Sequence, residues 1–407
     1  MILRRRGLGP VLSFVALGSF GVLAACGGGG SSSAAGTESG TAVIDSVMPG
    51  TPVDAPATTE STIATTTTEA GPHRISFAFS GDILIHSQVW TAAQANAGGV
   101  GYDFSPMFAD IQPLVSSVDL GICHLEVPIA PAGKEPSTFP LYGAPVELIA
   151  GIKSAGYDRC STASNHTLDQ GVAGIEATLA AFEANGLTQA GMARTPDEIE
   201  PKVIDVDGVK VTHLSYTWGY NGLETPSGES WRSARNNPER IIADAKKARE
   251  MGAQIVIVSM HWGVEPSAQI TSTQRQQAEE ITASGQVNLI VGHHSHVIQP
   301  IEQVNGIWTV FGLGNILSAH PTRSFFTDAS QDGMVVTVDM TIDDVTGAIT
   351  VLQPVAHPTW VDKDHGYVIR DVLAQLARTD LSAGQRATYE QSLARTQKQV
   401  AAYIATS

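Results

Sequence analysis

Short apolar runs alternate with amphipathic stretches along most of the chain. The segments that read as strands lie at residues 75–80, 120–127, 157–164, 254–260 and 288–291. Between them, the spacing of apolar residues is typical of helices at 145–155, 171–185, 238–251 and 272–284, and a Gly follows each of these segments. Strands that alternate with helices of this length predict βαβ units and a largely parallel sheet.

Two predicted hairpins interrupt this alternation. Asp207-Gly208 and Asn305-Gly306 each separate two β-rich runs, and both pairs suit the positive φ angles of a two-residue turn. Further β-rich runs lie at 333–342 and 348–354. The chain is therefore predicted to contain a mixed sheet or two sheets, followed by amphipathic helices at 367–378 and 382–404.

The N-terminus has the pattern of an export signal. Arg4, Arg5 and Arg6 precede an apolar run at 8–25, which ends in small residues before Cys26. This arrangement resembles a bacterial lipobox, which implies that residues 1–25 are a cleaved signal peptide and that Cys26 is acylated. The alternative is an ordinary signal peptide with an incidental cysteine. We expect an exported protein, held by its lipid on the outer face of the cell membrane.

Residues 26–72 differ in composition from the rest of the chain. They are rich in Gly, Ser, Thr, Ala and Pro and contain no Lys or Arg. Such a segment buries too little apolar surface to offset its ordering entropy, so we predict a flexible tether. No low-complexity break follows, and we expect one domain at 73–357 with a helical extension at 358–407.

The charge balance limits the partners of the protein. The chain has 24 Lys and Arg against 40 Asp and Glu, a net charge of −16. This excess argues against nucleic acid, whose binding depends on neutralising phosphates. An anionic substrate would have to be met by metal ions or by a local basic pocket.

Two cysteines remain within the predicted domain, Cys123 and Cys160. Both lie in apolar, strand-like runs, and neither belongs to a C-x-x-C zinc pattern. A disulfide between them is open to an exported protein, but we expect two buried free thiols.

Polar residues with metal-binding side chains follow five of the predicted strands. They are Asp82, Glu126, Asn165 with His166, His261, and His294 with His296. In open α/β sheets, sites gather outside the carboxyl ends of the strands, so these side chains are predicted to converge. Carboxylate, amide and imidazole ligands without thiolate suit Mn²⁺, Fe²⁺ or Zn²⁺, and the number of candidates favours two ions.

The motifs at these positions resemble those of a known family. In order, they are GDILIH at 81–86, LE at 125–126, SNHTLDQG at 164–171, YTWGYNG at 216–222, HWGVE at 261–265, GHHSHVIQP at 292–300 and LGN at 313–315. The chain resembles the CapA-type capsule biosynthesis proteins, which are linked to poly-γ-glutamate capsule synthesis or export and are similar to calcineurin-like metallophosphoesterases. The resemblance implies a four-layer α-β-β-α sandwich with C-terminal helices.

The resemblance also implies roles for individual residues. The implied metal ligands are Asp82, His86, Glu126, Asn165, His261, His294 and His296. His166 is the counterpart of a catalytic acid, Asp169 is placed to orient it, and Trp262, Glu265 and Asn221 are expected in the substrate pocket. The family usually has Asn where this chain has His124 and Pro where it has Ser295, so His124 is a candidate additional ligand. Alternation along a strand predicts that His293 points away and is structural.

Three functions agree with these patterns. The first is a metal-dependent hydrolase of an anionic ester or polymer, in which the ions activate water. The second is an accessory of capsule assembly that binds or cleaves poly-γ-glutamate, and the third is a metal-stabilised scaffold without catalysis. The sequence has no Gly-x-Ser-x-Gly nucleophile elbow and no phosphate-binding P-loop. A proton donor at His166 favours the hydrolase.

Overall fold

The computed structural model describes residues 73–322 and 325–406. The chain divides into two compact units, Met1–Thr67 and Thr68–Ser407, and all described residues belong to the second. The predicted signal peptide, tether and acylated Cys26 lie outside the described residues. Within the described part of the chain, no helix combines the length and apolar character needed to cross a membrane.

The larger sheet has nine strands and contains the first βαβ units. Its main order is β15-β14-β12-β1-β2-β3-β4, with β11 beside β1 and β13 beside β12. Strands β1 to β4 are mutually parallel, whereas β12 runs antiparallel to β1. The bounds are β1 (His73–Leu84), β2 (Leu120–Leu125), β3 (Arg159–Ser161), β4 (Thr188–Ala190), β11 (Asn315–Ser318), β12 (Asp332–Ile342), β13 (Ile349–Val351), β14 (Val355–Asp362) and β15 (Val368–Asp371).

The smaller sheet has six strands in the order β5-β6-β7-β8-β10-β9. Its parallel centre is flanked by the two predicted hairpins, β5-β6 and β9-β10, whose turn residues Asp207 and Asn305 have φ angles of 48° and 49°. The bounds are β5 (Ile204–Val206), β6 (Val209–Thr217), β7 (Ile255–His261), β8 (Leu289–His293), β9 (Ile301–Val304) and β10 (Ile307–Val310).

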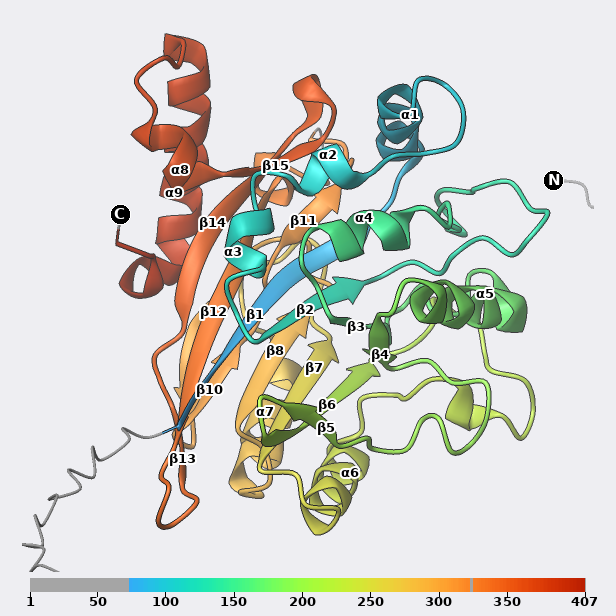
Figure 1. The fold of residues 1–407 in the computed structure, drawn as a ribbon, viewed down its shortest axis with the longest axis vertical. Coiled ribbons are helices and arrows are strands. Elements are labelled where there is room, and N and C mark those ends of the chain that lie inside the picture. Colours follow the sequence, from blue (N-terminus) through green and yellow to red (C-terminus); the bar gives the residue numbers. More distant parts are fainter. Residues whose placement is uncertain (1–72, 323–324, 407) are drawn as a thin grey trace, which may run out of the picture. The chain divides into compact units, whose positions relative to one another are not determined.

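Helices α1–α5 pack on the outer face of the larger sheet and α6 and α7 on that of the smaller sheet, whereas α8 and α9 lie beside β14 (Figure 1). The bounds are α1 (Ser87–Asn96), α2 (Ser105–Phe108), α3 (Gln112–Val115), α4 (Leu148–Ser154), α5 (Gly171–Ala184), α6 (Pro238–Glu250), α7 (Ser272–Ala283), α8 (Val372–Ala377) and α9 (Ala383–Val400). The four helices that the hydrophobic pattern predicted correspond to α4, α5, α6 and α7. The short helices α1, α2 and α3 were not predicted.

An apolar core lies between each pair of neighbouring layers. One joins the larger sheet to α1–α5 and includes Ile83 and Phe182. A second lies between the two sheets, where Phe77 of β1 belongs to the same cluster as Ile257 of β7. A third joins the smaller sheet to α6 and α7 and includes Ile281. The predicted α-β-β-α sandwich with C-terminal helices is therefore confirmed.

The predicted boundary between domain and extension needs correction. Residues 355–371 form β14 and β15, which continue the larger sheet instead of starting a helical extension. The predicted helix at 367–378 begins only at Val372, where the Asp371 side chain caps it by accepting from the Ala374 N–H. The β-branched residues of 355–362 pair with β12, and this pairing extends the sheet.

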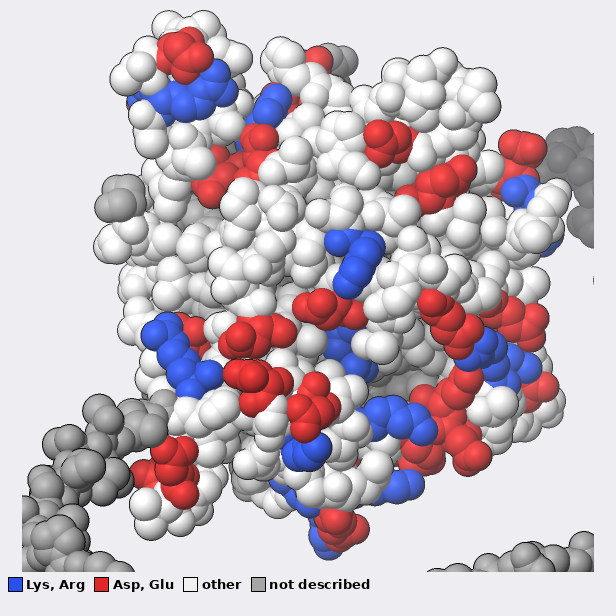
Figure 2. Space-filling model, in the orientation of Figure 1, with Lys and Arg blue, Asp and Glu red and all other residues white. Residues whose placement is uncertain are grey.

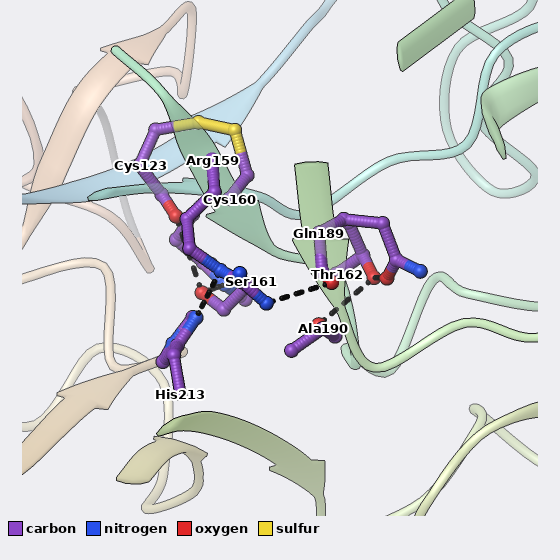
Figure 3. The surroundings of a disulfide bond; sticks show 9 residues. Cys123, Arg159, Cys160, Ser161, Thr162, Gln189, Ala190 and His213 are labelled. Atoms are coloured by element: carbon purple, nitrogen blue, oxygen red, sulfur yellow. Dashed lines mark hydrogen bonds between the residues drawn. A yellow bond between two sulfur atoms is a disulfide. The ribbon is translucent and has the colours of Figure 1, made fainter. Parts of the chain in front are cut away.

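The expected free thiols are also corrected, because Cys123 and Cys160 form a disulfide (Figure 3). The two residues lie directly opposite each other in the parallel β2–β3 pair, with their Cα atoms 4.4 Å apart. The register of these strands therefore brings the sulfur atoms together. On the next register pair, His124 Nδ1 and Ser161 Oγ lie 2.8 Å apart, so the disulfide adjoins the polar strand ends.

Candidate metal centre

The end of β1 positions Asp82 at the junction of the two sheets. The register of β1 shifts on both sides of this residue, and the Asp82 N–H donates to Gly314 O over 2.9 Å. A Cβ on Gly81 would stand 2.1 Å from the same oxygen, so only glycine permits this close approach. The Asp82 carboxylate is thereby buried and directed toward the second sheet.

The end of β8 departs from regular strand geometry. His294 and His296 have φ angles of 91° and 53°, which few residues other than Gly, Asn and Asp adopt. Strict alternation of side chains therefore ends at His293. This explains why His293, predicted to point away, instead has Nδ1 3.5 Å from Asp82 Oδ1.

Buried carboxylates and imidazoles from both sheets converge at these strand ends. Within each set of three, the ligand atoms lie within 4.8 Å of one another. The sets are Asp82, His124 and His293; Glu126, His261 and His294; Glu265, His294 and His296; and Asp82, Glu126 and His296. We refer to these eight residues as the acid–histidine cluster.

Asn165 adjoins the cluster through its side-chain amide. Its Oδ1 lies 3.0 Å from His261 Nε2, and its Nδ2 donates to Asn221 Oδ1 over 3.4 Å. Two metal bonds of about 2.1 Å at a right angle place their donor atoms about 3 Å apart. The spacing of Asn165 and His261 therefore suits adjacent ligands of one cation, and Asn221 supports the amide from behind.

Several buried atoms of the cluster have no hydrogen-bond partner. They are both carboxylate oxygens of Glu126 and the Nδ1 atoms of His293 and His294. Buried polar atoms in native proteins are nearly always satisfied, so four orphaned atoms at one point indicate an absent partner. Acceptors and imidazole nitrogens together fit a divalent cation, and the residues present are compatible with divalent metal binding.

The pKa shifts within the cluster are also compatible with the binding of a cation. Burial alone would lower the pKa of His296, but Glu126 and a hydrogen bond to Asp82 raise it to about 10. Burial raises the pKa of Glu126 well above its usual range, and it lowers the pKa of His294 to about 3. Without a cation, a proton on His296 therefore neutralises part of the charge that a metal ion would neutralise.

The His166 ring lies beside the cluster and is held by Asp169. Its Nδ1 donates to Asp169 Oδ2 over 2.7 Å, and the same oxygen accepts from the Tyr142 N–H, also over 2.7 Å. The Tyr142 ring packs edge-on against the imidazole, with centroids 4.7 Å apart. These contacts hold the His166 ring in one orientation, and its Nε2 takes part in no hydrogen bond among the described residues.

Two of the predicted site residues, His86 and Trp262, do not belong to the acid–histidine cluster. His86 belongs to none of the ligand sets. Its Nδ1 accepts from the Ala319 N–H over 3.2 Å, and its Nε2 lies 3.2 Å from Tyr142 Oη, so His86 is part of the pocket wall. Trp262 is buried in the core beneath α7, where its Nε1 donates to Phe311 O over 2.9 Å. It therefore does not reach a substrate.

Glu265 and Asn221 lie where a substrate pocket was expected, although Glu265 also belongs to the cluster. Both line a cavity of about 590 Å³ that opens beside the cluster. Sequence reasoning missed Tyr142 and His320 in its wall, and it misassigned His293. The repeated His of 293–296 was the available signal for His293, whereas no sequence pattern marks Tyr142 or His320.

Comparisons with known proteins give the family. A family model described as "Bacterial capsule synthesis protein PGA_cap" matches residues 76–320. The "PGA biosynthesis protein CapA" of Bacillus subtilis is 30% identical over 179 residues, which cover 42% of this chain and 45% of that protein. The "Capsule biosynthesis protein CapA" of Bacillus anthracis is 28% identical over 175 residues, covering 42% of each chain. The match thus spans less than half of the length of these relatives.

Similar solved structures include two enzymes of low sequence identity. A phosphatase from Mycoplasma pneumoniae has a TM-score of 0.42 and 15% identity, covering 70% of this chain and 94% of that chain. The calcineurin-like phosphoesterase YfkN from Bacillus subtilis has a TM-score of 0.41 and 12% identity, covering 80% and 97%. The family model alone matches more than half of this chain. The chain therefore belongs to the PGA_cap family of bacterial capsule synthesis proteins.

Proposed function

We propose that this chain is a metal-dependent hydrolase of an anionic ester or polymer that acts in poly-γ-glutamate capsule synthesis or export. The observation that carries the proposal is the buried acid–histidine cluster next to the oriented His166–Asp169 pair. A scaffold would need the metal ligands but not an oriented imidazole at a cavity. The capsule role is supported by the family and by the names of the curated relatives.

The cluster supplies ligands from both sheets. Asp82, Glu126, Asn165, His261, His294 and His296 would hold one or two ions of Mn²⁺, Fe²⁺ or Zn²⁺, and His124, His293 and Glu265 are close enough to contribute. When bound, such a metal supplies Lewis-acid polarisation and activates water. Asn165 ties the loop that contains His166 to the ligand set, so it fixes where the imidazole stands relative to the cluster.

His166 is the proposed general acid. Because Asp169 accepts from Nδ1, the proton available for transfer is on Nε2, which lies at the cavity. Nε2 would protonate the oxygen of the departing group as the ester bond breaks. Asp169 acts through His166 by keeping the ring in this orientation, and its own contact with the Tyr142 N–H keeps the carboxylate in place.

Substitution of His166 tests the proposal. Removal of a general acid typically lowers the rate by about 10²–10⁴. We expect His166→Ala to lose this factor in kcat on phosphomonoesters or phosphodiesters while it keeps the metal content of the parent. The matched control is His357→Ala, because His357 contacts Thr337 outside the cluster, and its turnover should be unchanged. A metal-loaded parent protein that hydrolyses neither phosphoesters nor poly-γ-glutamate would contradict the hydrolase and leave a non-catalytic capsule accessory or scaffold.

The N-terminal pattern supports a proposed location on the outer face of the cell membrane, with Cys26 as the acylated residue. We expect Cys26→Ser to move the protein from the membrane fraction to the medium, as measured by immunoblotting of both fractions. Val345→Ser, a change at an exposed position that leaves the lipidation signal and the disulfide intact, is the control. Membrane retention of the Cys26→Ser protein would contradict acylation at this residue.

A further inference from the structure

The cavity beside the cluster has two kinds of wall. The wall toward the cluster is polar and includes His296, Glu265, Asn165 and His166. Other parts of the wall are apolar and come from separate segments of the chain. These apolar residues are Leu84, Phe139, Pro140, Leu141, Leu223, Pro321 and Phe326. At about 590 Å³, the cavity has the size of a small-molecule site.

Phe139 and Leu141 are exposed next to the cavity. Their exposed fractions are 77% and 46%, although burial elsewhere would be favourable for both side chains. Both belong to the segment that also positions Tyr142, whose N–H and hydroxyl contact Asp169 and His86. The apolar surface is thus continuous with the residues that orient His166. It is therefore placed to contact the part of a substrate that lies beyond the reacting bond.

No Lys or Arg is among the described residues that line this cavity. With His296 taken as a metal ligand, the charged side chain left in the lining is the carboxylate of Glu265. Lys363 is not among the lining residues, and its ammonium donates to the His320 carbonyl oxygen. Figure 2 shows basic side chains scattered among acidic ones on the face that it draws, without a continuous basic patch. A polyanion with a carboxylate in every repeat would therefore bind unfavourably here, because no Lys or Arg lines the cavity to pair with its distal charges.

We infer that the substrate carries its negative charge at the reacting group alone, and that an apolar organic group of the same molecule occupies the Phe139–Leu141 side of the cavity. This inference rests on the proposed hydrolase and names its substrate class, an ester with an alkyl or other uncharged apolar substituent. Tyr142 and Asn221 supply neutral hydrogen-bonding groups in the same wall. Poly-γ-glutamate itself, with a carboxylate in every repeat, lies outside this substrate class.

A series of alkyl phosphate monoesters tests the inference, because methyl, butyl and octyl phosphate have leaving groups of similar basicity. Each methylene that enters the cavity should raise kcat/KM by about fourfold, which corresponds to about 0.8 kcal/mol of transfer free energy. The matching alkylphosphonates should show the same dependence in binding, measured by calorimetry on the metal-loaded protein. A γ-glutamyl oligomer should bind more weakly than octylphosphonate.

The variant Leu141→Lys provides a reversal of specificity. It places a cation in the apolar wall, so the chain-length dependence should fall and binding of the γ-glutamyl oligomer should strengthen. Val345→Lys is the matched control, because this substitution makes the same change in net charge. Val345 is 93% exposed in the turn between β12 and β13. The control should keep the chain-length dependence of the parent.

The outcomes separate the two proposals. Turnover without dependence on chain length, or tighter binding of the γ-glutamyl oligomer than of octylphosphonate, would overturn the substrate class and leave the hydrolase intact. Absence of turnover on every ester would overturn the hydrolase, whereas the alkylphosphonate titrations would still decide what the cavity binds.

Discussion

The disulfide between Cys123 and Cys160 leads to a prediction of stability. The perturbation is the double variant Cys123→Ala with Cys160→Ala. The bridge closes a loop with a sequence separation of 37 residues, and the chain-entropy model assigns about 4 kcal/mol to a loop of this size at room temperature. Both side chains are buried within the sheet, so the smaller alanines add a minor packing loss. We expect the free energy of unfolding to fall by about 3–5 kcal/mol.

The assay is urea unfolding followed by circular dichroism, with and without a reducing agent. The oxidised parent should be more stable than the reduced parent, and the double variant should not respond to reductant. Because His124 and Ser161 occupy the next register pair, the variant should also bind metal more weakly. A loss below about 1 kcal/mol would refute the argument, since it would mean that the bridge does not restrict the unfolded chain.

Two further predictions concern the corrected residues. Trp262→Phe should cost about 1–3 kcal/mol of stability by leaving Phe311 O unpaired in the core, with metal content unchanged; equal unfolding midpoints would contradict this role. Burial lowers the pKa of His86 to about 4. Between pH 6.5 and 4, His86 is therefore protonated in the unfolded chain and neutral in the folded chain. Stability of the metal-free protein should therefore fall as the pH drops from 6.5 to 4, by about 3 kcal/mol from His86 alone. Thermal melts of His86→Gln should show a shallower pH dependence, and an unchanged slope would exclude this cause.

The convergence of the strand-end polar residues could be predicted, because parallel strands present their carboxyl ends on one edge of a sheet. This rule holds for Asp82 of β1 and His261 of β7, which lie in different sheets of the sandwich. The rule alone does not state how two sheets face each other, and the family resemblance supplied that orientation. Helices α4–α7 and both hairpins could also be predicted, because the formation of each depends mainly on residues close in sequence.

The positions of three side chains were predicted wrongly, because they depend on local backbone geometry and on tertiary packing that the hydrophobic pattern does not reveal. Alternation along an ideal strand placed His293 on the wrong face, because the positive φ of His294 ends that alternation. Trp262 directly follows His261 of the cluster. Because successive side chains of a strand point to opposite faces, His261 points toward the cluster and Trp262 enters the core. His86 lies beyond the end of β1, and its contacts with Ala319 and Tyr142 depend on tertiary packing.

The central claim is that the acid–histidine cluster is a metal centre, and metal content tests it most directly. The purified parent protein, the Asp82→Ala/His261→Ala double variant and the His357→Ala control would be dialysed against Mn²⁺, Fe²⁺ or Zn²⁺ and analysed for bound metal. We expect the parent and the control to retain at least one divalent ion per chain and the double variant to retain none. Equal metal content in the double variant and the parent, or a parent that binds no divalent ion, would contradict the account.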